Sequence, residues 1–143
     1  GDSTGAANAI NARGQAVGYT ADAATVRHAA LWSATGEVTR LGALPGTESS
    51  EAFGINDAGT VVGAARSGDT GRAFLWTRTG GLQDLNALVP RSHAVLTKAV
   101  GINDKGEIVA IGQEAPPGGP TSRDGHTASE RPVRVFLLSP VRP

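Results

Sequence analysis

The sequence predicts an all-β protein of three tandem units, each about 46 residues long and each a four-stranded antiparallel sheet. Three observations predict this fold. One phrase occurs three times, as AANAINARGQAVGYT (6–20), EAFGINDAGTVVGAAR (51–66) and KAVGINDKGEIVAIG (98–112). The 20 glycines punctuate short apolar runs, as turns do between short strands. Nowhere do apolar residues recur at three- and four-residue spacing over ten or more positions, so we expect no long helix.

Equivalent positions set the period of the repeat. Ile10, Ile55 and Ile102 are 45 and 47 residues apart. A second phrase keeps the same period, as RHAALW (27–32), GRAFLW (71–76) and VRVFLL (133–138), and a third occurs twice, as VTRLGALPG (38–46) and LQDLNALVP (82–90). We therefore divide the chain into unit 1 (1–48), unit 2 (49–95) and unit 3 (96–143), with unit 3 lacking its fourth strand.

Four strands are expected in unit 2, in the order of its phrases. The first ends in GIN (54–56), the second is TVVGA (60–64), the third is RAFLW (72–76) and the fourth is LQDL (82–85). The first two are joined by NDAG (56–59), for which NDKG (103–106) and NARG (11–14) are the equivalents. Asn and Asp favour the start of a type I turn, and a left-handed glycine closes a three-residue hairpin.

The residues of these hairpins are interpreted as structural. Gly14, Gly59 and Gly106 are expected to have positive φ, and a β-branched or bulky side chain there should break the turn. Asn56, Asp57, Asn103 and Asp104 are predicted to form turns rather than to bind calcium. Each turn supplies one carboxylate, whereas Ca²⁺ takes about 6–8 oxygen ligands.

The third strand predicts how the units pack. Strand alternation places Phe74 and Trp76 on one face and Ala73 and Leu75 on the other. Because both faces are apolar, each sheet must be covered on both sides, as in stacked sheets. The predicted core of the stack comprises Leu31, Trp32, Phe74, Leu75, Trp76, Phe136 and Leu137. Trp32 and Trp76 are therefore read as packing residues rather than sugar platforms, while Tyr19 is a freer candidate for a rim contact.

The phrases RHAALW, LGALPG and AFGINDAGTVVG together resemble the HAF repeat of secreted bacterial repeat proteins, over nearly the whole chain. The resemblance implies export to the bacterial envelope or beyond it, a propeller-like array and no established catalytic residues. VFLLSPVRP (135–143) resembles the end of such an array, so the chain is expected to be a C-terminal portion. Of the namesake histidines only His28 is present, because Arg72 and Arg134 occupy the equivalent positions. That exchange argues against histidine-dependent chemistry.

Three units are too few for an ordinary closed propeller, which typically has four to eight blades. The chain could belong to a longer array, pair with a second copy to complete a ring, or be covered by a different protein. Uncapped terminal sheets expose apolar faces and strand edges. We therefore expect a protein partner or self-association.

Unit 3 has an insertion in QEAPPGGPTSRDGHTASER (113–131), whose Pro and Gly content disfavours a regular helix or strand. Ser122, Asp124 and His126 lie within five residues on it, with nothing to hold a catalytic geometry. A partner contact is the better interpretation, since contacts concentrate on loops. The candidate contact residues are Arg123, Asp124, His126 and Glu130.

Composition narrows the function further. Thirteen basic and thirteen acidic residues give no net charge, so a nucleic-acid partner is not expected. Cysteine is absent, which removes disulfides and thiolate chemistry, and no apolar run approaches the about 20 residues of a membrane-spanning helix. The chain starts at Gly1 and contains no methionine, so we expect it to be processed or part of something longer. We predict no cofactor, no metal and no catalytic residues.

The leading hypothesis is a non-catalytic exported module, either a structural or interaction scaffold or an accessory subunit of a larger assembly. A carbohydrate-binding propeller module is the alternative, with a glycan as ligand. A propeller hydrolase or lyase is a third class, and it lacks a paired acid and base in the sequence.

Overall fold

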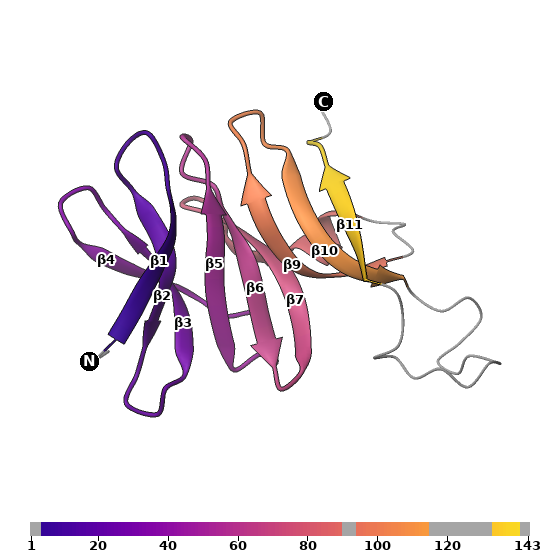
Figure 1. The fold of residues 1–143 in the computed structure, drawn as a ribbon, viewed down its shortest axis with the longest axis horizontal. Helices are drawn as coiled ribbons and strands as arrows, with labels where there is room; N and C mark the ends of the chain where they lie inside the picture. Colours follow the sequence, from indigo (N-terminus) through magenta and orange to yellow (C-terminus); the bar gives the residue numbers. More distant parts are fainter. Residues whose placement is uncertain (1–3, 90–93, 115–132, 141–143) are drawn as a thin grey trace.

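The computed structural model describes residues 4–89, 94–114 and 133–140, which form three antiparallel sheets standing side by side in chain order (Figure 1). Sheet 1 consists of β1 (Thr4–Ile10), β2 (Ala16–Ala21), β3 (Arg27–Trp32) and β4 (Val38–Gly42). Sheet 2 consists of β5 (Ser49–Ile55), β6 (Val61–Ser67), β7 (Thr70–Thr77) and β8 (Gly81–Asp84), followed by α1 (Leu85–Leu88). Sheet 3 consists of β9 (Ala94–Ile102), β10 (Ile108–Glu114) and β11 (Val133–Leu138).

The all-β prediction is confirmed, and each sheet is a simple meander in which consecutive strands pair. Three predicted boundaries are wrong. β9 begins at Ala94, so dividing units 2 and 3 after residue 95 would split a strand. Leu85 begins α1 instead of ending a strand, because Asp84 caps the helix by accepting a hydrogen bond from the Asn86 amide. Gln113 belongs to β10, which continues its pairing with β9 and β11.

The glycine hairpins form as the sequence predicts. Gly14, Gly59 and Gly106 have φ of 78°, 86° and 80°. In the middle hairpin the Gly59 amide donates to the Asn56 carbonyl (3.0 Å), and the Asn56 amide donates to the Thr60 carbonyl (3.1 Å). The other two hairpins repeat both bonds. All three lie at the same end of the sheets (Figure 1).

The first strand of every sheet carries an irregularity at an equivalent position. The pairing register shifts between Ala7 and Ala9, between Ala52 and Gly54, and between Gly101 and Ala99. Such bulges re-aim side chains. In sheet 1, the Asn8 side chain crosses to sheet 2 and donates to the Ala52 carbonyl (2.8 Å) and to Glu51 Oε2 (2.9 Å).

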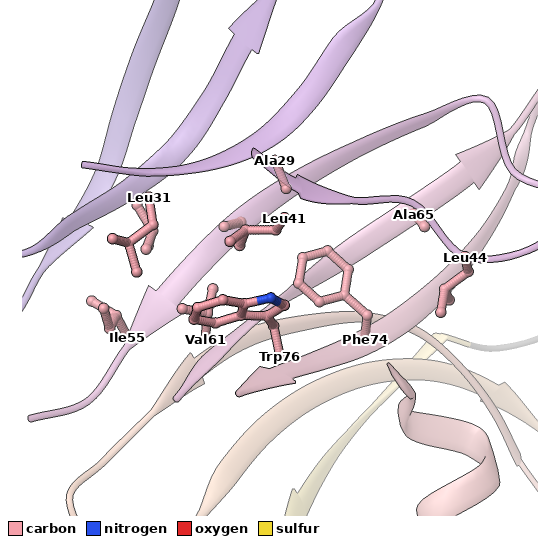
Figure 2. Packing of buried hydrophobic residues seen from close by; sticks show 11 residues of the cluster. Ala29, Leu31, Leu41, Leu44, Ile55, Val61, Ala65, Phe74 and Trp76 are labelled. Atoms are coloured by element: carbon pink, nitrogen blue, oxygen red, sulfur yellow. The ribbon is translucent and has the colours of Figure 1, made fainter. Parts of the chain in front are cut away.

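The sheets enclose two apolar layers. Between sheets 1 and 2, Phe74 and Trp76 of β7 face Leu31 and Leu41 (Figure 2). Between sheets 2 and 3, Ala73 and the partly buried Leu75, from the opposite face of β7, pack with residues of β9 and β10. Alternation along β7 therefore gives sheet 2 two buried faces, as the sequence predicts.

Not every predicted core residue is buried. Leu31, Phe74 and Trp76 are buried, and Leu75 and Phe136 are partly buried against the second layer. Trp32 is half-buried on the outer face of sheet 1. The prediction is wrong for Leu137, which is 68% exposed, because it lies on the face of sheet 3 that points away from sheet 2.

Candidate functional site

The three hairpins are joined to one another by side chains, which the turn interpretation did not foresee. The Ala12 amide donates to Asp57 Oδ1, and the Asp57 amide donates to Asp104 Oδ1, both at 2.8 Å. In parallel, Asn11 Nδ2 donates to the Asn56 carbonyl (2.9 Å), and Asn56 Nδ2 donates to the Asn103 carbonyl (3.1 Å). The first and second hairpins thus each donate two hydrogen bonds to the next one along the chain. We call this arrangement the turn ladder.

The asparagines of the turn ladder also hold their own hairpins. Asn56 Oδ1 accepts from the Thr60 amide (2.9 Å), and Asn11 and Asn103 accept from the amides of Gln15 and Glu107 (both 3.0 Å). Asn56 is buried between its neighbours. A side chain that bonds within its turn and to the next one fixes the spacing between sheets as well as the shape of the turn.

The sequence contained a signal for the turn ladder that turn chemistry alone does not explain. NARG makes the same hairpin without an aspartate, since Ala12 stands where Asp57 and Asp104 stand. The turn therefore does not require the aspartate. The aspartate of units 2 and 3 is explained by the hydrogen bond that its carboxylate accepts from a backbone amide of the preceding unit.

The outer face of sheet 3 is apolar, and no other described element covers it. Val135 is 72% and Leu137 68% exposed, and Val109 beside them on β10 is also exposed. Val109 pairs with Leu137 across the β10–β11 ladder, so these side chains form one patch. We call it the outer face; its exposed apolar members are Val95, Val100, Val109, Val133, Val135 and Leu137.

A polar cavity of about 320 Å³ lies where all three units meet. Arg27 contributes from unit 1, Glu51 and Arg66 from unit 2, and Lys98 from unit 3. Both carboxylate oxygens of Glu51 accept hydrogen bonds, Oε1 from Arg27 (2.8 Å) and Oε2 from Asn8. The Lys98 ammonium lies 4.9 Å from the centre of the Phe53 ring. These contacts join neighbouring units through side chains of their strands.

His28 and Arg72 occupy equivalent positions and make structural contacts. His28 Nε2 lies 3.1 Å from Asp22 Oδ2. This hydrogen bond, with those from the Val26 and Ala24 amides, holds the pKa of the Asp22 carboxyl below its usual value. The contact therefore stabilises the β2–β3 turn at neutral pH and is lost as the pH falls through that lowered pKa. Arg72 bonds Asp84 and the Pro45 carbonyl of unit 1.

The remaining sequence-predicted residues divide into two groups. Arg123, Asp124, His126 and Glu130, with Ser122, lie outside the described residues. Tyr19 is half-buried on β2, with the Arg27 guanidinium 4.2 Å above its ring.

Among residues 4–89, 94–114 and 133–140, no three His, Asp or Glu side chains gather as a metal site would need. No helix of those residues is long and apolar enough to cross a membrane.

Comparison with family models, with curated proteins and with solved structures finds no match for the chain.

Proposed function

We propose that this chain is a non-catalytic repeat module, exported to the bacterial cell envelope or the extracellular space, that acts as a structural or interaction scaffold or as an accessory subunit of a larger assembly. Its sheets are blades of a propeller that is completed by oligomerisation or by a partner. The resemblance of its phrases to the HAF repeat supports export and the propeller array.

The observation that carries the proposal is the outer face. Six exposed valine and leucine side chains gather on one sheet of a small domain. Contiguous apolar patches of this kind mark interaction sites in soluble proteins. The equivalent faces of sheets 1 and 2 are covered by the next sheet, so the module presents at its end the surface it uses internally.

The charged contacts are consistent with a scaffold. Glu51, the carboxylate of the central cavity, bonds a guanidinium and an amide that hold unit 1 against unit 2. Trp76 is packed between sheets 1 and 2, so its ring is not available to stack against a sugar (Figure 2). These side chains support packing roles in place of acid–base catalysis or sugar stacking.

Photo-cross-linking in the cells that make the protein tests this function. A photoreactive amino acid replaces Val135 on the outer face or, as control, Thr79 in the exposed β7–β8 turn. We expect the envelope or secreted fraction to contain the protein and a discrete cross-linked species for position 135 alone. Equal cross-linking at both positions, none at either, or confinement to the cytosol contradicts the proposal.

A further inference from the structure

The outer face repeats, position for position, a surface that is buried elsewhere in the chain. Val109, Val135 and Leu137 of unit 3 correspond to Val62, Ala73 and Leu75 of unit 2, because the repeat aligns Ile102 with Ile55 and VRVFLL with GRAFLW. In unit 2, Val62 and Ala73 are fully buried and Leu75 is partly buried, all under sheet 3. Unit 1 shows the same arrangement, with Val17, Ala29 and Leu31 buried under sheet 2.

The turn ladder also stops at unit 3 with donors still available. Asn11 Nδ2 bonds both Gln15 within its turn and Asn56 of the next turn. Asn103 Nδ2 makes the equivalent internal bond to Glu107 (2.8 Å). For its second hydrogen, and for the Asp104 amide, the described residues supply no acceptor. A following hairpin in the same register would accept the first at its asparagine carbonyl, and the second only if it carried an aspartate.

The opposite end of the stack offers the complementary surface. Ile10 is 70% exposed, whereas its equivalent Ile55 is buried against sheet 1. Val38 is 51% exposed, and its equivalent Leu82 packs against the layer between sheets 1 and 2. Sheet 1 therefore presents outward the kind of face that sheet 2 presents to sheet 1. We call it the head face, with Ile10, Trp32 and Val38 as its large side chains.

We propose that the outer face of sheet 3 receives the head face of a second copy of this chain, head to tail, with Asn103 Nδ2 donating to the Asn11 carbonyl of that copy. The inference rests on the proposed function and names the partner of its interaction surface. It continues an interface that the chain already makes twice within itself. Two copies of the three described sheets would give six, within the four to eight blades typical of propellers, so a closed dimer is the expected assembly.

One rung of the turn ladder is missing at this junction, and it supplies a specific test. At the proposed junction the Asp104 amide would face Ala12, which has no carboxylate. Its equivalent within the chain, the Asp57 amide, faces the carboxylate of Asp104. The interface between copies is therefore weaker than the one within a chain. Ala12→Asp restores the acceptor and should tighten association.

The first experiment measures mass by light scattering during size exclusion, for the 143-residue chain and two variants. We expect twice the chain's 14.5 kDa for the unmodified protein. Val135→Glu blocks the outer face and Ile10→Glu the head face, and each variant alone should run as a monomer. An equimolar mixture should recover dimer. The Val135→Glu copy retains its head face and the Ile10→Glu copy retains its outer face, and these two faces form one intact junction. Both positions are exposed within the chain, so folding is preserved, which circular dichroism checks.

The second experiment measures the dissociation constant of Ala12→Asp by sedimentation. A hydrogen bond to a carboxylate justifies an expected decrease of about tenfold. Ala23→Asp, which adds the same charge in the exposed β2–β3 turn, is the control and should leave the dissociation constant unchanged. An equal change in both variants, or none in either, overturns the ladder contact.

Failure of this inference differs from failure of the proposed function. An unmodified chain that stays monomeric at all concentrations, or a mixture that recovers no dimer, overturns the second copy as partner. Persistence of dimer in Ile10→Glu alone would indicate two outer faces packed together and would also overturn it. A cross-link from position 135 to a different protein overturns the inference while leaving the scaffold function standing.

Discussion

Gly63→Ala is expected to destabilise the chain by about 3 kcal/mol, at the upper end for overpacking a core. Gly63 of β6 lies opposite Ala52, beside the bulge of β5. A Cβ atom there would overlap the Glu51 carbonyl and lie 2.8 Å from both the Ala52 Cα and the Phe74 ring. Two of these neighbours are backbone atoms and cannot rotate away. Chemical denaturation at neutral pH measures the loss.

Gly101→Ala is the matched control. Gly101 also lies in a strand beside a bulge, but a Cβ atom built on it meets nothing within 4 Å. Its free energy of unfolding should change by less than about 1 kcal/mol. Similar losses for the two substitutions would contradict the close approach of β5 and β6. Unit 3 carries Ala110 at the position equivalent to Gly63, and β9 there has a second register shift, between Lys98 and Leu96.

Phe74→Ala is expected to cost about 3–5 kcal/mol, the usual range for removing a buried phenylalanine. The ring is fully buried between sheets 1 and 2, beside Trp76 (Figure 2). Alanine would leave a cavity that the paired strands on both sides cannot collapse to fill. Thermal or denaturant unfolding gives the change in free energy directly.

Phe136→Ala tests whether burial, rather than residue type, sets that cost. Phe136 is the repeat equivalent of Phe74 but is only partly buried, on the last strand of sheet 3. Phe136→Ala should lower the free energy of unfolding clearly less than Phe74→Ala does. An equal or larger loss would mean that the layer between sheets 2 and 3, and not the one between sheets 1 and 2, dominates stability.

The elements that the sequence predicts well are those determined locally. β3 and β11 coincide with the phrases RHAALW and VRVFLL, and the glycine hairpins form where Asn and Gly specify them. These features depend on alternation and on positive φ, both of which are properties of neighbouring residues. The sequence does not predict α1, because Asp84 has the pattern of a strand residue and only its side-chain hydrogen bond from the Asn86 amide starts the helix.

The candidate site depends on contacts between units, which local patterns do not reveal. The local pattern explains Asp57 only as a turn residue, whereas its bond to the Ala12 amide joins positions 45 residues apart. The repeat predicts a core position for Leu137 from its equivalents Leu31 and Leu75, and in the structure those two have a sheet over them. The repeat predicts what a position does when a neighbour follows. It does not predict that Leu137 is left uncovered by the other described residues.

Stacking of the units through the turn ladder is the claim on which the register of the proposed dimer depends. Amide hydrogen exchange of Asp104→Ala, followed residue by residue by NMR, tests it most directly, since alanine removes the carboxylate that accepts from the Asp57 amide and leaves the Ala12–Asp57 bond intact. The Asp57 amide should exchange at least tenfold faster than in the unmodified chain, while the Ala12 amide keeps its rate. Unchanged exchange at Asp57, or equal acceleration at both amides, would contradict the turn ladder.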